Sequence, residues 1–247
     1  MIYIKKEEIP KETKQKIIAI RKSDKWKKIA ANDTDSIREV FDSDFPKNEV
    51  KEFLIHEQRG LCAYCMRRIS SDIHSRIEHW MPLSKDKEKA IDYDNMLGVC
   101  DGGEKMISRQ GHILCCDAHK KEAEITISPL NKVQMDKIAY KFDGTIYTEP
   151  RDKDMERDIN EILLLNGIRK PDGSVRDTST ELLKGRRDAY TRAKRMMMEL
   201  NKKGKCTSSQ LKKIMNILRE QDQYEEYVGV KLYYLEKKYI SMLRRGI

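Results

Sequence analysis

Two cysteines separated by two residues, Cys62-Ala-Tyr-Cys65, place the strongest constraint on how this chain can fold. This spacing lets one tight turn aim both thiolates at a single tetrahedral ion, and Zn²⁺ is the metal that such sites favour. A redox pair would instead open a helix after a strand in a βαβ pattern, and no such pattern is evident here. We therefore predict half of a structural zinc site, in a domain that relies on the metal because its core is small.

The zinc site needs two more ligands, and the sequence offers three cysteines for them. Cys100 follows the apolar run NMLGV, and the adjacent Cys115 and Cys116 come after the segment DGGEKMISRQGHIL. Cys100 and one member of the adjacent pair are therefore the expected ligands. Cys206 lies far along the chain in a basic segment, and we expect a spare thiol there.

The expected location of the protein also favours metal ligation over disulfides. The opening residues, MIYIKKEEIP, lack the apolar stretch and cleavage site of a signal peptide, and no run approaches the ~18 apolar residues that span a bilayer. We therefore expect a cytoplasmic protein with no membrane partner. Cysteines stay reduced in that compartment, so those with ligand-like spacing are interpreted first as metal sites.

A second group of polar residues lies between the two halves of the zinc site. It consists of Glu78 and His79 in the segment RIEHWMP, followed by Asn95 in YDN. A histidine alone is more often a structural hydrogen-bonding residue than a catalyst, but this whole combination seldom arises by chance. His79, with an ordinary pKa near ~6.5, can take a proton from water at neutral pH, while Glu78 can bind a hard cation. These residues suit metal-assisted phosphodiester hydrolysis.

The nesting of these residues between cysteines resembles the HNH nucleases, whose ββα-metal fold is a β-ribbon with a following helix. More narrowly, the segments HEQRGLCAYCMRRI, IEHWMPLSK, YDNMLGVC and DINEILLLN are similar to the PtuB family, the HNH component of Septu anti-phage systems that also accompanies some retrons. The similarity runs from about residue 1 to 195. The chain departs from the family where DGGEKMISRQGHIL separates cysteines that usually form a compact pair. Alignment to the family's Cys-x-x-x-Lys step favours Cys116 as the fourth zinc ligand, with Cys115 as the alternative.

The resemblance implies a role for each polar residue of the motif. His79 would be the general base, Glu78 a ligand of a catalytic Mg²⁺ or Mn²⁺, and Asn95 the residue that orients the histidine loop by hydrogen bonds. Asp117, which stands where the family more commonly has His or Asn, would provide a second oxygen to the metal. His119 is the alternative to Asp117.

We expect an α+β fold, mostly α, in which a small zinc-stabilised HNH (ββα-metal) core is flanked by N-terminal and C-terminal helices. The predicted parts are a helical region 1–58, the nuclease core 59–150, and a basic helical region 151–247 for docking a partner or DNA. Hydrophobic spacing predicts helices around 48–58, 163–165, 196–200 and 211–218, and YKFDGTIYT predicts a hairpin with Asp143-Gly144 at its turn.

The positive charge is concentrated in the last quarter of the chain. The net charge is +9, and from Lys184 onward there are 17 basic and 7 acidic residues. Such a segment suits a polyanion such as DNA, and equally an acidic protein. The sequence contains no Gly-x-x-x-x-Gly-Lys loop, so any ATP dependence would have to come from a partner.

The resemblance therefore implies a metal-dependent HNH endonuclease that hydrolyses DNA phosphodiester bonds in anti-phage defence. It also implies control by an ABC-type ATPase of the PtuA kind, and a retron reverse transcriptase with its nucleic acid is a further candidate partner. The alternative is a catalytically silent, zinc-containing subunit for nucleic-acid binding or assembly.

Overall fold

The computed structural model describes residues 1–105 and 112–245. Its regular elements are mostly helices, and the strands in these ranges form two-stranded antiparallel sheets, so the chain is α+β. The helices are α1 (Lys11–Lys22), α2 (Asp24–Lys28), α3 (Thr34–Ser43), α4 (Lys47–Glu57), α5 (Cys116–Lys120), α6 (Lys132–Met135), α7 (Lys153–Arg157), α8 (Leu182–Lys202), α9 (Ser208–Glu220) and α10 (Val228–Leu243), with short turns η1 (Glu88–Ile91), η2 (Tyr93–Asn95) and the π-helical η3 (Asp158–Ile162). The strands are β1 (Ser75–His79), β2 (Met96–Cys100), β3 (Ile138–Tyr140), β4 (Ile146–Thr148), β5 (Ile168–Arg169) and β6 (Val175–Arg176).

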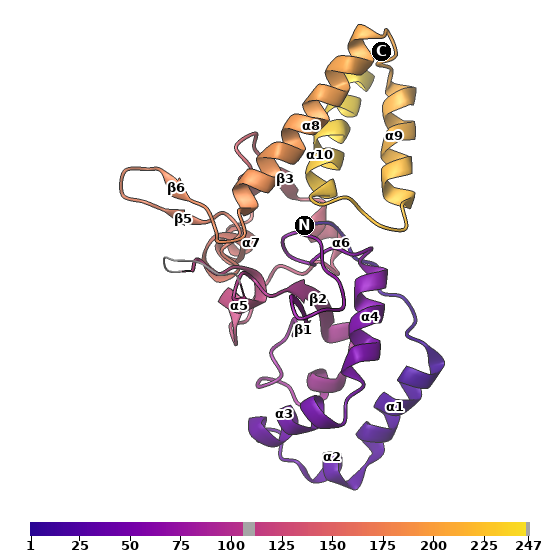
Figure 1. The fold of residues 1–247 in the computed structure, drawn as a ribbon, viewed down its shortest axis with the longest axis vertical. Helices are drawn as coiled ribbons and strands as arrows, with labels where there is room; N and C mark the ends of the chain where they lie inside the picture. Colours follow the sequence, from indigo (N-terminus) through magenta and orange to yellow (C-terminus); the bar gives the residue numbers. More distant parts are fainter. Residues whose placement is uncertain (106–111, 246–247) are drawn as a thin grey trace.

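Strands β1 and β2 form an antiparallel ribbon in the middle of the molecule (Figure 1), with Glu78 opposite Leu97. A buried amide fixes the ribbon against helix α4: Gln58 donates to the carbonyl of Gly98 and accepts from its N–H, both at 2.7 Å. A Cβ at Gly98 would lie 3.2 Å from this amide. Because glycine has no side chain, the amide of Gln58 can come close enough to make both backbone hydrogen bonds of Gly98 that an adjacent strand would otherwise make.

The chain leaves the ribbon after Cys100 and returns to it at α5. Gly102 has a φ of +62°, and a Cβ there would lie 2.2 Å from the carbonyl oxygen of Cys115, so a larger residue would push the two segments apart. The N–H of Cys115 donates to the carbonyl of Gly102 at 3.1 Å. The two ends of the segment DGGEKMISRQGHIL therefore lie next to each other, so the segment does not hold Cys100 and Cys116 apart in space.

Buried side chains gather in two clusters. The first joins helices α1–α4, with Trp26, Ile37 and Leu54, to residues 83–96. The second runs from Met1 through the cysteines and the β3–β4 hairpin to Leu235 on α10. Each cluster includes residues from more than one of the three predicted parts of the chain, whose boundaries stay a prediction.

Helices α8, α9 and α10 pack together at one end of the long axis, and α1–α3 lie at the other, with the ribbon between them (Figure 1). Arg186, which is fully buried, fixes the base of α8: its guanidinium donates to the carbonyls of Gly144 and Leu165. Both acceptor carbonyls lie in turns, where no regular helix or sheet hydrogen bond is present to pair them. In the described ranges, no helix is both long and apolar enough to cross a lipid bilayer.

Most of the secondary structure expected from hydrophobic spacing is confirmed, including α4, α8, α9 and the hairpin with Gly144 at its turn. The helix predicted over Leu163–Leu165 is wrong. The helical segment ends at Ile162, and Leu164 has a φ of +48°. The chain turns there, and the carbonyl of Leu163 accepts the N–H of Cys116 at 2.9 Å. The prediction failed because a run of leucines buried in a turn cannot be distinguished by composition from the apolar face of a helix.

Candidate metal centre and catalytic cleft

The predicted zinc knuckle forms a tight turn. The N–H of Met66 donates to the carbonyl of Cys62 at 3.0 Å, and the N–H of Cys62 donates to the carbonyl of Arg67 at 2.9 Å. Met66 has a φ of +64°, which closes the turn after Cys65. Both thiols therefore point to the same side, as the spacing predicted.

Four cysteine sulfurs meet beneath the ribbon. The Sγ atoms of Cys62, Cys65, Cys100 and Cys116 all lie within 4.8 Å of one another, and all four residues are buried. Cys65 and Cys100 are 3.7 Å apart and Cys62 and Cys116 are 4.0 Å apart, sulfur to sulfur. Four thiolates at the usual Zn–S distance would be separated by about 3.8 Å, so this donor set fits a tetrahedral metal ion such as zinc.

Cys115 lies outside this cluster. Its thiol hydrogen-bonds the carbonyl of Gly102 at 3.6 Å and approaches the hydroxyl of Thr180 at 3.4 Å. The structure therefore groups Cys116, and not Cys115, with the other three cysteines. Cys206 is half-buried and is not grouped with the other cysteines among the described residues.

A cleft of about 330 Å³ contains most of the residues predicted for the catalytic site, but not Asn95. Glu78, His79 and Asp117 all line it, although Glu78 and His79 are neighbours on one strand. Side chains of neighbouring strand residues usually point to opposite faces, but His79 is the last residue of β1, where the chain enters a loop. The other lining residues are Arg38, Phe41, Asp42, Arg76, Ile77, Pro82, Leu83, Glu104, Ala118, Lys121 and Glu122.

The surroundings of His79 keep its imidazole neutral. The residue is buried, its ring packs edge-on against Phe41 with centroids 4.6 Å apart, and burial lowers its pKa below the ordinary value. Its Nε2 lies 3.0 Å from the carbonyl oxygen of Ala90, an atom that can only accept, so the ring proton is assigned to Nε2. The lone pair is then on Nδ1, the atom available as a base.

Asn95 fixes the loop that follows His79. Its Oδ1 accepts the N–H of Met81 at 2.8 Å, and its Nδ2 donates to the carbonyls of Met81 and Lys89 at 2.9 and 3.0 Å. Its carbonyl also accepts the N–H of Trp80. Every polar group of this buried side chain is thus bonded to backbone, and the side chain ties the loop after His79 to Lys89.

Glu78 is buried in contact with a cation and a phenol. Lys120, whose side chain is fully buried, lies 2.8 Å from Oε1, and the hydroxyl of Tyr64 donates to the same oxygen at 3.0 Å. Burial and the adjacent Asp117 carboxylate raise the pKa of Glu78 well above its ordinary value. Two carboxylates that repel each other in a buried place form a site that a further cation would stabilise.

The two candidates on α5 are placed differently. Asp117 faces the cleft, where one of its oxygens is 3.4 Å from Arg76. His119 is directed elsewhere, because its Nδ1 lies 2.9 Å from the carbonyl of Ile162, and it is not among the cleft residues. Asp117 is therefore the member of this pair that accompanies Glu78.

Neither Lys120 nor Tyr64 was expected from the sequence to have a role in the site. The available signal was the position of Lys120 in the Cys-x-x-x-Lys step, which puts it one turn after Cys116 on the face of α5 that packs on the ribbon. Tyr64 lies inside the Cys-x-x-Cys turn. The ammonium of Lys120 also donates to the carbonyl of His79 at 3.2 Å, so it contacts both members of the Glu-His pair.

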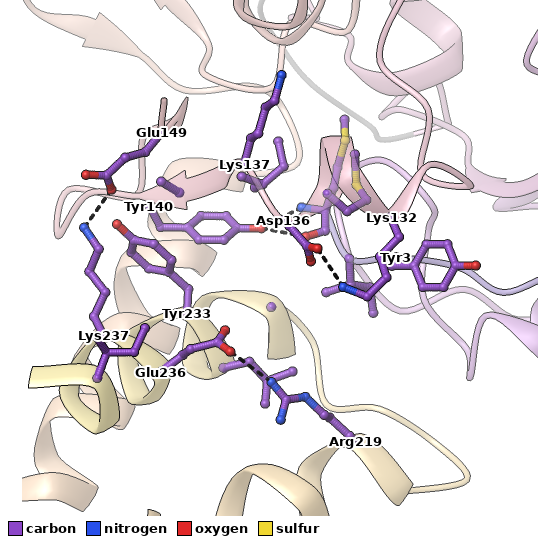
Figure 2. A pocket seen from close by; sticks show the side chains of 18 of the residues that line it. Tyr3, Lys132, Asp136, Lys137, Tyr140, Glu149, Arg219, Tyr233, Glu236 and Lys237 are labelled. Atoms are coloured by element: carbon purple, nitrogen blue, oxygen red, sulfur yellow. Dashed lines mark hydrogen bonds and ion pairs between the residues drawn. The ribbon is translucent and has the colours of Figure 1, made fainter. Parts of the chain in front are cut away.

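A larger groove of about 870 Å³ lies between the N-terminal residues, β3 and α10 (Figure 2). Six of its charged side chains are paired with one another: Lys132 with Asp136, Arg219 with Glu236, and Lys237 with Glu149, while Lys137 pairs with Asp152 outside the groove. It contains none of the residues predicted to be catalytic. The groove of greater volume is therefore not the one that contains the candidate catalytic residues.

Comparison with known protein families gave no match, and a search of curated proteins also found none.

Proposed function

We propose that this protein is a metal-dependent endonuclease of the HNH type, with β1, β2 and α5 as its ββα core. The observation that carries the proposal is the cleft in which Glu78, His79 and Asp117 meet, next to a four-cysteine cluster that fits zinc. A base and two carboxylates in one cleft are the groups that hydrolysis of a phosphodiester with one divalent ion requires.

His79 would act as the general base. Its depressed pKa keeps Nδ1 unprotonated at neutral pH, ready to take a proton from the water that attacks phosphorus. The hydrogen bond from Nε2 to Ala90 orients the ring, and Asn95 holds the loop on which the ring depends. The leaving 3′ oxygen must also gain a proton, which solvent in the open cleft can supply.

Glu78 and Asp117 would hold Mg²⁺ or Mn²⁺, because carboxylate oxygens are the ligands that these ions prefer. When bound, the ion supplies stabilisation of the negative charge on the phosphate and the departing oxygen. Lys120 and Tyr64 occupy one oxygen of Glu78 and leave the carboxylate anchored in one orientation. The cysteine cluster would hold a structural zinc with no open position, joining knuckle, ribbon and α5.

The biological role that we propose is anti-phage defence, with DNA as substrate and an ABC-type ATPase of the PtuA kind as the controlling partner. The support for this part is the similarity of HEQRGLCAYCMRRI, IEHWMPLSK and YDNMLGVC to the PtuB family. A retron reverse transcriptase with its nucleic acid is a further partner that the same similarity suggests.

The test compares site variants with a matched histidine control on plasmid DNA. His79→Ala, Glu78→Gln and Asp117→Asn should each lower the cleavage rate in Mg²⁺ by at least about a hundredfold. His56→Ala, which removes an exposed histidine on α4, should cut like the wild type. Zinc content and thermal unfolding should be unchanged in Asp117→Asn. If all proteins retain zinc and none cuts DNA, with or without the ATPase, the silent binding or assembly subunit is favoured instead.

A further inference from the structure

A second groove lies on the helical bundle, between α8, α10 and the tip of the β3–β4 hairpin. It has a volume of about 430 Å³, within the ~300–1,000 Å³ range of ligand pockets. Its lining consists of three cations, three aromatic residues and a threonine, with no acidic residue: Phe142, Arg187, Tyr190, Thr191, Lys194, Tyr234 and Lys238. This composition differs from that of the groove in Figure 2, whose lining includes carboxylates that pair with its cations.

The three cations of the bundle groove are exposed and converge from two helices. Arg187 and Lys194 lie two turns apart on one face of α8, and Lys238 faces them from α10. None of the three pairs with a carboxylate in residues 1–105 and 112–245, whereas Lys184 and Lys237 on the same helices do. The groove therefore presents positive charge that no carboxylate within the described chain neutralises.

The aromatic residues give the groove flat apolar surfaces. Tyr190 and Tyr234, which both line the groove, pack edge to face with ring centroids 4.9 Å apart. Phe142 is 74% exposed at the hairpin tip, where it covers nothing of the core. Its neighbour Asp143 is engaged in the turn, accepting the N–H of Thr145 at 2.9 Å.

We propose that this groove binds a single-stranded nucleic acid, with phosphates on Arg187, Lys194 and Lys238 and a base stacked on Phe142. Unpaired cations beside an exposed ring are the features that bind a single strand without reading its sequence. An acidic protein segment would use the cations but would leave the ring without a partner. As a contact for substrate the groove rests on the proposed nuclease function, but its binding of a strand is testable without any cutting.

Binding is measured by fluorescence anisotropy with labelled oligo-dT, oligo-U and an abasic strand of equal length, over a series of salt concentrations. The full-length protein carries His79→Ala and is kept in buffer without Mg²⁺ or Mn²⁺, which prevents cleavage while leaving zinc in place. Replacing Arg187, Lys194 and Lys238 by alanine should weaken binding and reduce the salt slope by about 2, since each lost contact with a single strand removes about 0.7. The matched control replaces Lys203, Lys212 and Lys213, which are exposed outside the groove, and should leave the affinity within about threefold.

Phe142→Ala should raise the Kd for oligo-dT or oligo-U about tenfold at an unchanged salt slope, and should not affect the abasic strand. Thermal unfolding shows whether each variant is folded. Equal loss in the groove and control triple variants would overturn the proposal, and so would poly-glutamate competing as well as the oligonucleotide. If the groove triple variant binds as tightly as the control triple variant while the wild-type protein cuts plasmid, the groove is rejected and the nuclease proposal stands. If the groove triple variant binds more weakly than the control but the wild-type protein does not cut plasmid, the groove stands and the nuclease proposal is rejected.

Discussion

His79 shows how single residues set the chemistry of the cleft. Its ring is buried against Phe41 and its Nε2–H is committed to Ala90, so both the charge state and the tautomer are fixed by groups outside the motif. The motif RIEHWMP indicates the position of the proposed base. Its environment, which decides whether it can act as one, comes from α3 and η1 and could not be predicted from the motif alone.

The depressed pKa of His79 predicts the pH dependence of cleavage. Because burial favours the neutral ring, the active form persists below the ordinary pKa of about 6.5. The single-turnover rate in Mg²⁺ should stay constant as the pH falls from 8 to about 6.5 and decrease only in more acidic solution. A rate that already falls by half between pH 8 and 7 would argue against His79 as the base.

Lys120 is predicted to position Glu78. The two side chains form a buried ion pair at 2.8 Å, and removing one partner of such a pair leaves an uncompensated charge that costs about 3 kcal/mol. Lys120→Met should therefore lower the free energy of unfolding by about that amount, and should cost much less in a Glu78→Gln background. Urea unfolding of the four proteins measures this coupling. Additive losses would show that the two residues act independently.

At the scale of elements, the cysteine spacing predicted most of the metal centre. Two residues between Cys62 and Cys65 allow only a tight turn, and that turn is present. The fourth ligand was harder to predict, because the segment between Cys100 and Cys115 gives no sign that it returns to its starting point. The contact between Gly102 and Cys115 brings it back, and it depends on glycine backbone geometry that sequence patterns do not reveal.

The choice between the adjacent cysteines predicts a difference in zinc content. Cys116→Ser should lose most of the bound zinc and unfold at a much lower temperature, because zinc ligation supplies folding free energy. Cys115→Ser should keep its zinc, since Cys115 bonds to Gly102 and Thr180 instead. Metal analysis of the two purified variants decides this. Zinc retained by Cys116→Ser and lost by Cys115→Ser would reverse the assignment.

At the scale of the whole molecule, the four-cysteine cluster packs together with distant parts of the chain. Its buried cluster includes Met1 and Ile4 at the start of the chain and Leu182 to Leu235 near its end. These long-range contacts follow from no local sequence pattern, and the expected division of the chain at 59–150 stays a prediction. Helix existence was predictable from apolar spacing, but the partners of each helix were not.

A fragment of residues 59–150 is therefore predicted not to fold cooperatively, even with zinc. It would expose the sides of Met66 and Tyr140 that lie against Gly229 and Tyr233 of α10 in the full chain, and that apolar area is needed to offset chain entropy. Circular dichroism during heating should show no sharp transition. A cooperative transition in the zinc-loaded fragment would show that the flanking helices are dispensable.

The most direct test of the nuclease proposal is cleavage of supercoiled plasmid by the wild-type protein and by His79→Ala, in Mg²⁺ and in EDTA, alone and with a co-purified ATPase partner. We predict cutting by the wild type in Mg²⁺ only, and its loss in a folded His79→Ala protein that still carries zinc. Equal cutting by both proteins would contradict the role of His79, and no cutting in any mixture would contradict the nuclease itself.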